Sequence, residues 1–99
     1  MYKTDKQLWH DLYNEDVDEF HNKVKEELLE MGLTFTHWLD DKAESCDLAE
    51  EIADVYIQIE KLMTVYEKEL QKDFLEALYR KQETIRKWVY FNPNDREEQ

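Results

Sequence analysis

The sequence contains very few of the residues that turns, disulfides and serine chemistry require. Among its 99 residues there is one glycine, one proline, one cysteine and a single serine, Ser45. So few turn-forming residues exclude a β-sandwich, a barrel or a hairpin meander, and also a glycine-rich phosphate loop. The lone Cys46 excludes an internal disulfide and a multi-cysteine zinc site, and no nucleophile motif surrounds Ser45. A helical chain is what remains.

Charge is abundant and mostly of one sign. The net charge is −12, with 19 acids and 7 bases in residues 1–71 and six of each in residues 72–99. This balance argues against binding nucleic acid through a broad basic face. Hydrophobic residues still make up 41% of the chain, including 13 aromatic side chains, so we expect it to fold. Without a leader-like segment or a long apolar run, we expect a soluble, cytoplasmic protein with no membrane partner.

Apolar residues recur at helical spacing, which predicts an all-α antiparallel bundle of three to four main helices. Thr4 or Asp5 can cap a first helix, and residues 14–16 offer caps for a second one. We expect Gly32 to end that second helix, because glycine is the usual residue just past a helix C-terminus. Residues 33–42 are then predicted to form a loop with at most one helical turn.

The third helix has the most regular apolar pattern. Spacings of four and three alternate along a row that we call the seam, made of Leu48, Ile52, Val55, Ile59, Leu62 and Tyr66. This coiled-coil-like pattern predicts helix packing and a homodimer or homotetramer. A turn near residues 67–72, capped by Asp73, is expected before the last helix. We predict one domain over residues 1–93 and a mobile polar tail over residues 94–99.

Two acidic pairs lie beside the predicted apolar stripes. At about 100° per residue, Glu27 and Glu30 share one flank of the second helix, and Glu51 and Asp54 share one flank of the third. If these helices pack antiparallel through their stripes, the four carboxylates converge at the groove between them. Crowded acids repel, and a hard divalent cation such as Mg²⁺, or Mn²⁺ in its place, removes the repulsion. Acidic pairs usually lie on a solvated helix face, but two matched pairs favour a metal site.

The acidic residues also form a recognisable motif. Residues 26–30 read Glu-Glu-Leu-Leu-Glu and residues 51–54 read Glu-Ile-Ala-Asp, with 20 residues between them. This resembles the MazG-like, all-α nucleoside triphosphate pyrophosphohydrolases, whose motif is E-E-x-x-E followed after a variable gap by E-x-x-D. Residues 51–56 look like that family's metal-binding helix, and residues 81–88 look like its basic closing helix. The resemblance covers about residues 17–90.

The resemblance implies a reaction and a set of site residues. The implied metal-binding and catalytic residues are Glu27, Glu30, Glu51 and Asp54. They would hold Mg²⁺ ions that bridge the triphosphate and position a water that splits the α–β linkage, giving a nucleoside monophosphate and pyrophosphate. Residues from a neighbouring subunit can complete such a site, as family members commonly pack helices between subunits.

Phosphate and base would need further side chains. Lys81 and Arg86 match the family's phosphate-binding pattern best, although many members have an asparagine in the closing segment where Thr84 and Ile85 stand here. The candidate base-binding residues are Trp9, His10 and Trp38. The first two precede the acidic pair, where family members use aromatic or histidine side chains, and Trp38 lies between the acidic helices. Each could instead be a core residue.

Two other classes of protein compete with this hypothesis. A ferritin-like di-iron site requires Glu-x-x-His on two helices, and the residues three before the histidines here are Gln7, Asp18 and Thr34, which excludes it. The remaining alternative is a non-enzymatic acidic oligomerisation or regulatory module, or an inactive family member that binds nucleotide. The seam supports that alternative as well as it supports an oligomeric enzyme.

Overall fold

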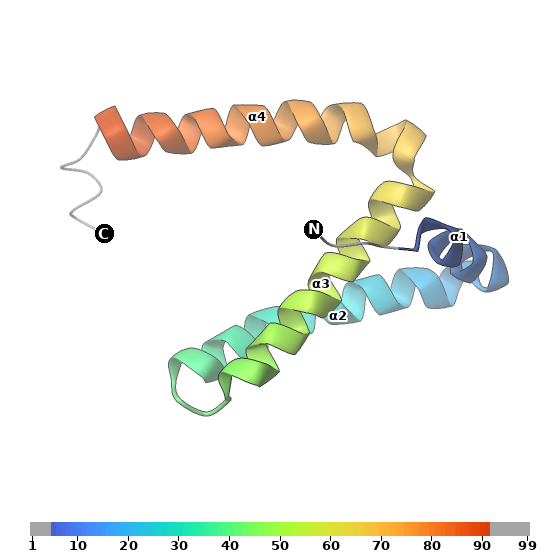
Figure 1. The fold of residues 1–99 in the computed structure, drawn as a ribbon, viewed down its shortest axis with the longest axis horizontal. Coiled ribbons are helices and arrows are strands. Elements are labelled where there is room, and N and C mark those ends of the chain that lie inside the picture. The colour runs from blue at the N-terminus through green and yellow to red at the C-terminus, as the bar shows by residue number, and fades with distance from the viewer. Residues whose placement is uncertain (1–4, 92–99) are drawn as a thin grey trace. The chain divides into compact units, whose positions relative to one another are not determined.

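The computed structural model describes residues 5–91, which form four helices (Figure 1). They are α1 (Lys6–Glu15), α2 (Val17–Leu39), α3 (Ser45–Val65) and α4 (Glu67–Phe91). The described range contains no strand, which confirms the all-α prediction. The chain divides into two compact units between Val65 and Tyr66, so that α1, α2 and α3 form the first unit and α4 belongs to the second. None of the helices within residues 5–91 combines the length and apolar character needed to cross a membrane.

Two aspartates start the first two helices, as the capping pattern predicts. The Asp5 carboxylate accepts a hydrogen bond from the Leu8 backbone N–H at 3.0 Å, and the Asp16 carboxylate does the same for Glu19 at 3.0 Å. Each bond satisfies a backbone donor that has no partner within its own helix. The alternative cap at Thr4 and the predicted tail over residues 94–99 lie outside the described residues.

The prediction that Gly32 ends the second helix is wrong. Helix α2 continues through Gly32 to Leu39, so most of the expected loop over residues 33–42 is helical. Glycine costs a helix only about 1 kcal/mol relative to alanine. Beyond this point Thr34 is half-buried, the Thr36 hydroxyl donates to the Gly32 carbonyl at 3.0 Å, and Phe35 stacks on Trp38. These contacts offset that cost.

The actual end of α2 is a Schellman motif built on an aspartate. Asp41 takes a left-handed conformation with φ of 59°, its N–H bonds the Trp38 carbonyl, and the Lys42 N–H bonds the His37 carbonyl. Aspartate is among the few residues besides glycine that adopt this conformation readily. The sequence therefore carries its stop signal at residues 40–41 rather than at its only glycine.

The junction after α3 also differs from the prediction. The helix breaks at Tyr66 and α4 begins at Glu67, so Asp73 lies inside α4 and does not cap it. The Tyr66 carbonyl accepts hydrogen bonds from the N–H groups of Glu69 and Leu70, at 3.1 and 2.9 Å. The first turn of α4 thus forms directly on the last residue of the break.

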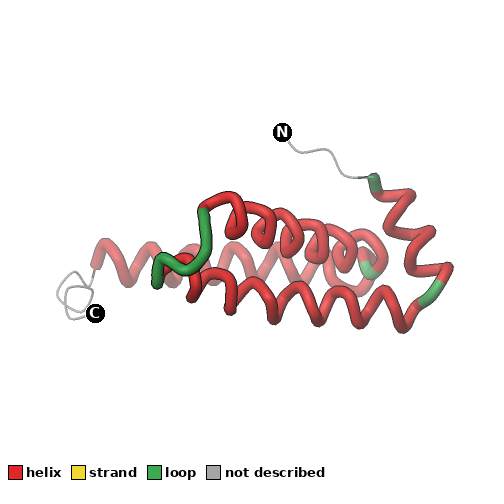
Figure 2. Tube along the Cα trace, turned by 90° about the horizontal axis from the view of Figure 1, so that it is seen from below, coloured by secondary structure: helices red, strands yellow, loops and turns green. Residues whose placement is uncertain are grey.

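Helices α2 and α3 form an antiparallel hairpin that positions the acidic residues (Figures 1 and 2). On α2 the inward row contains Phe20, Val24 and Glu27, which are all buried. On α3 the buried residues are Gln58, Lys61 and Thr64, and Glu51 and Asp54 on the same side are half-buried. The interface between the two helices is therefore largely polar on the α3 side.

The seam is only partly covered in the structure. Ile52 and Ile59 are 51% and 44% exposed, and the other seam residues are half-buried. Helix α3 contacts α2 through the flank that carries the acids, about 60° or more away from the centre of the seam. An apolar row is consequently left accessible on α3 within the first unit.

Helix α4 is amphipathic and has no buried residue among those described. Its large apolar side chains, including Phe74, Leu75 and Leu78, are exposed, while Ala77, Trp88 and Val89 are half-buried. An amphipathic helix gains its stability mainly by packing its apolar face. Taken by itself, α4 therefore offers an apolar face to a partner.

Candidate metal centre

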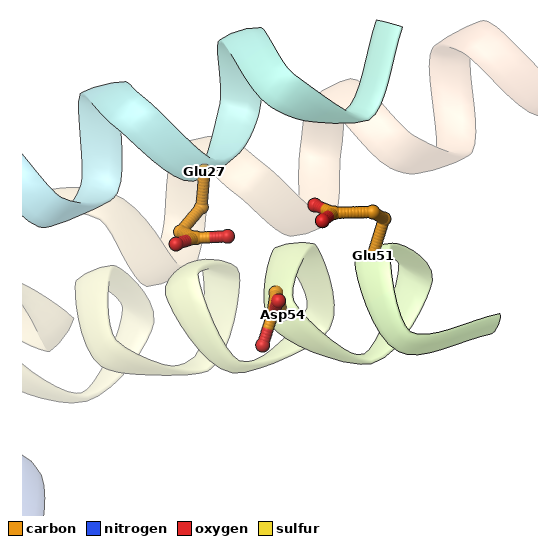
Figure 3. A group of neighbouring side chains, drawn as sticks. All are labelled: Glu27, Glu51 and Asp54. Carbon is orange, nitrogen blue, oxygen red and sulfur yellow. The ribbon is translucent and has the colours of Figure 1, made fainter. Parts of the chain in front are cut away.

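Three carboxylates meet between α2 and α3 (Figure 3). Glu27 comes from α2, and Glu51 and Asp54 lie one turn apart on α3. One oxygen from each of the three side chains can be chosen so that all lie within 4.8 Å of one another. Two oxygens bound to one Mg²⁺ at about 2.0–2.1 Å are at most about 4.2 Å apart, so a small movement of the side chains would let a single cation contact all three groups.

Burial distinguishes this group from an ordinary acidic surface. Glu27 is only 6% exposed, and the Oε2 atoms of Glu27 and Glu51 are shielded from solvent without a hydrogen-bond partner. A buried carboxylate oxygen without a partner is destabilising, since it has lost its hydration and gained nothing in return. A cation held between the helices would satisfy both oxygens, so the residues fit the metal that the sequence predicts.

The electrostatics of the group agree with its geometry. Burial raises the pKa of Asp54 above its ordinary value, and the neighbouring Glu27 charge raises it further. Burial likewise raises the pKa of Glu51, with contributions from the charges of Glu30 and Asp54. Both shifts mean that negative charge is disfavoured where these oxygens lie. A divalent cation would reverse that preference.

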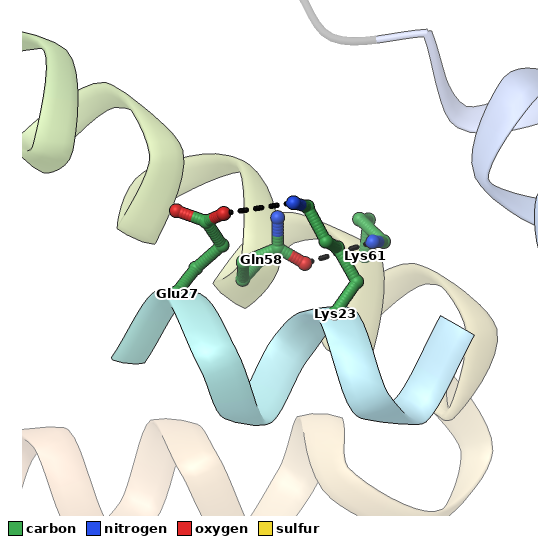
Figure 4. A network of polar contacts seen from close by, with 4 residues as sticks. All are labelled: Lys23, Glu27, Gln58 and Lys61. Carbon is green, nitrogen blue, oxygen red and sulfur yellow. Dashed lines mark hydrogen bonds and ion pairs between the residues drawn. The ribbon is translucent and has the colours of Figure 1, made fainter. Parts of the chain in front are cut away.

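Lys23 contacts Glu27, and Lys61 contacts the neighbouring Gln58 (Figure 4). The Lys23 Nζ lies 3.1 Å from the Glu27 Oε1, and this contact raises the pKa of Lys23. The Lys61 Nζ donates to the Gln58 Oε1 at 2.8 Å and lies 4.6 Å from the centre of the Phe20 ring. Lys61 is 4% exposed, and burial lowers its pKa.

Sequence reasoning missed Gln58 and Lys61. They continue the spacing of Glu51 and Asp54 along α3 at steps of four and three, so they lie on the same face of the helix. The seam on the neighbouring face has the stronger apolar pattern, so the sequence favours it as the buried face. The spacing of Glu51, Asp54, Gln58 and Lys61 along one face of α3 is the signal that could have predicted their burial.

Glu30, the fourth predicted ligand, is exposed and stands outside the group of three. It follows Glu27 by nearly one turn on α2, and its charge is close enough to contribute to the raised pKa of Glu51. The structure thus brings three of the four predicted carboxylates together, with the fourth at the edge. Its catalytic role stays a prediction.

The predicted base-binding residues occupy different settings. Trp9 is buried in α1 and its Nε1 has no hydrogen-bond partner, whereas His10 is exposed. Trp38 lies in the last turn of α2 rather than in a loop, stacks on Phe35, and donates to the Ser45 Oγ at 3.2 Å. That bond ties the end of α2 to the start of α3, which is a structural contact.

A cavity of about 360 Å³ lies in the first unit next to the lysines. Its lining is formed by Leu12, Glu15, Asp16, Glu19, Phe20, Lys23 and Lys61. Because Lys23 both lines the cavity and contacts Glu27, the cavity and the carboxylate group are adjacent. None of the three predicted base-binding residues is among those that line it.

The predicted phosphate-binding residues belong to the second unit. Lys81 and Arg86 are exposed on α4, and the Arg86 Nε lies 3.5 Å from the Glu83 Oε2. Exposed pairs of this kind contribute little to stability, which leaves Arg86 available for an anionic ligand.

Comparisons of the chain with protein-family models, with curated proteins and with solved structures found no match. The functional assignment therefore rests on the residues and the geometry of this chain.

Proposed function

We propose that the protein is a Mg²⁺-dependent nucleoside triphosphate pyrophosphohydrolase, which cleaves (d)NTP to (d)NMP and pyrophosphate. The observation that carries the proposal is the buried Glu27 facing Glu51 and Asp54 within 4.8 Å, with unpartnered oxygens on Glu27 and Glu51. The acidic motifs that resemble the MazG-like family supply the reaction class. Neither feature alone would distinguish this chain from an acidic helical bundle.

The three carboxylates would hold the ion, with Mn²⁺ as a possible substitute. When bound, Mg²⁺ neutralises phosphate charge and lowers the pKa of a coordinated water. The chain itself supplies the rigid placement of ligands on two packed helices, and the hairpin shields one side of the carboxylates from water. Lys23 and Lys61 add positive charge beside the acids, where an anionic substrate would otherwise be repelled.

We include a homodimer or homotetramer in the proposal. The exposed seam residues Ile52 and Ile59 on α3 and the exposed apolar side chains of α4 support it, because a second copy would cover both surfaces. The same surfaces favour the alternative function, a non-enzymatic acidic oligomerisation or regulatory module or an inactive nucleotide-binding protein. That alternative requires assembly and does not require the three carboxylates to bind a metal.

A panel of NTPs and dNTPs tests the proposal, with pyrophosphate release measured with and without Mg²⁺. We expect Mg²⁺-dependent release from at least one nucleotide, and a loss of roughly several hundredfold or more in Glu51→Gln and Asp54→Asn. Glu50→Gln is the matched control, since Glu50 is exposed and the substitution removes the same charge beside Glu51. Unchanged turnover in both site variants would contradict the assignment, and assembly without any turnover would favour the alternative.

A further inference from the structure

We propose that the Lys23 ammonium is the resident counter-ion of Glu27 in the metal-free protein, and that a divalent cation must displace it to bind. This inference rests on the cation site of the proposed function and assigns Lys23 a role in it. Lys23 would set the cation concentration at which the site fills. It would act on the cation through Glu27 and is a positioning residue rather than a catalytic one.

The two members of the pair are held very differently. The Lys23 Nζ lies 3.1 Å from the Glu27 Oε1, yet the Lys23 side chain is 51% exposed and that of Glu27 only 8%. The Glu27 side chain is therefore almost entirely shielded from solvent, whereas the lysine is not. The lysine can withdraw by rotating its flexible stem, so an incoming cation would displace the lysine and leave the carboxylate in place.

Lys23 also has a second partner available on its own helix. Glu19 precedes it by four residues and Glu27 follows it by four, so the three side chains lie on one face of α2. A glutamate four residues before a lysine is the orientation that isolated helices favour. The contact with Glu27 is nevertheless the one that forms. The greater need of the buried Glu27 for a counter-ion explains this choice, and Glu19 can accept the lysine once it is displaced.

The ammonium satisfies the acidic group incompletely. It contacts one oxygen of one carboxylate, while the Oε2 atoms of Glu27 and Glu51 stay without partners. A divalent cation can contact an oxygen from each of Glu27, Glu51 and Asp54, which lie within 4.8 Å of one another. It would therefore exchange one single-charge contact for three contacts of a doubly charged ion.

Displacement predicts that removing the lysine tightens cation binding. We expect Lys23→Met to bind Mn²⁺ alone about three- to tenfold more tightly than the wild type, because no ammonium has to be displaced. Lys25→Met is the matched control, since Lys25 is exposed on the opposite side of the same helix and its loss changes the net charge equally. Its affinity should change by less than about twofold, as expected for a screened surface charge. Lys23→Arg keeps the competing charge and should restore an affinity close to that of the wild type.

Isothermal titration of the full chain with Mn²⁺, after treatment with a chelator, measures these affinities. Circular dichroism first verifies that each variant is folded, and Lys23→Gln replaces Lys23→Met if the latter is not. Melting with the chelator present should show Lys23→Met to be less stable than the wild type, because Glu27 has lost its counter-ion. Equal or weaker Mn²⁺ binding by Lys23→Met would overturn the inference and show that Lys23 merely orients Glu27.

The inference and the proposed function fail in different ways. Mn²⁺ binding that ignores Lys23, together with pyrophosphate release, overturns the counter-ion role alone. Tighter Mn²⁺ binding by Lys23→Met without any pyrophosphate release overturns the enzymatic proposal alone. Absence of Mn²⁺ binding in the wild type and in every variant overturns the cation site, and both proposals with it.

Discussion

The α2–α3 hairpin and helix α4 place their polar and apolar residues in opposite ways. In the hairpin, Glu27, Gln58, Lys61 and Thr64 are buried and an apolar seam is left accessible. In α4 no described residue is buried, and large apolar side chains are exposed beside a basic segment over residues 80–88. Burying ionisable groups costs stability unless they are paired, and such groups gather at functional sites. The comparison therefore favours the hairpin as the place of the proposed cation site and α4 as a surface for contacts with other molecules.

Among the variants that compare these two regions, the largest expected effect separates cation binding from phosphate binding. We predict that Lys81→Ala or Arg86→Ala lowers kcat/KM for the best nucleotide by about 10- to 100-fold, because each removes a charge that would contact phosphate. Mn²⁺ affinity should stay the same, since its ligands belong to the first unit. Lys72→Ala is the control, as Lys72 is another exposed cation of α4. Loss of Mn²⁺ binding in Lys81→Ala or Arg86→Ala would contradict the assignment of cation binding to the first unit and phosphate binding to the second.

An intermediate effect tests whether the accessible apolar rows are interfaces between copies. We predict that Ile59→Glu on α3 and Leu75→Glu on α4 each weaken self-association by about tenfold or more, because a charge would be buried in the contact. Glu76→Gln, at an exposed neighbouring position of α4, should leave assembly unchanged. Sedimentation equilibrium measures the association. If only one of the two variants dissociates, the interface belongs to that region alone, and if neither does, the proposed assembly is wrong.

The smallest expected effect concerns pH and the metal-free hairpin. Asp54 and Glu51 have pKa values raised above their ordinary 3.8 and 4.5, so the folded state binds these protons more tightly than the unfolded state. Their contribution to stability is therefore present at low pH and is lost as pH rises through the raised pKa values. With a chelator present, we predict that Asp54→Asn melts a few degrees higher than the wild type near neutral pH.

That difference should shrink as the pH falls through the raised pKa of Asp54, because the wild type is then protonated at this position as well. Added Mg²⁺ should raise the melting temperature of the wild type and not that of Asp54→Asn, because binding to the native state alone is stabilising. A wild type that melts higher than Asp54→Asn in chelator at neutral pH would show that the Asp54 charge is not strained by its neighbours.

The all-α class and the first two helix starts followed from the sequence, because a side-chain cap depends on residues only three positions apart. Asp5 and Asp16 fulfil that local rule. The end of α2 did not follow from the sequence, because packing of the residues beyond Gly32 overrides the local cost of glycine. Asp41 then supplies the left-handed residue that the rule assigns to glycine.

The sequence predicts the candidate site as far as it predicts the position of each residue around its helix. Spacing placed Glu51 and Asp54 on one flank and Glu27 on another, and the structure brings these three together. The spacing did not predict that this flank of α3 faces α2, with Gln58 and Lys61 buried beside it. The apolar periodicity favoured the seam as the inward face instead. The choice of inward face depends on contacts between helices that a single sequence does not specify.

If the proposed cation site forms, the polar row between α2 and α3 would make the stability of this hairpin depend on the ions around it. Helix pairs held by apolar contacts resist salt and chelators, whereas the buried Glu27 is paired with a half-exposed lysine and would be paired with a metal ion when one is bound. Cation supply would then govern how often the hairpin opens, and with it how readily proteases cut the chain. The carboxylates of the proposed metal site would thereby make the stability of the hairpin respond to the concentration of free divalent cations.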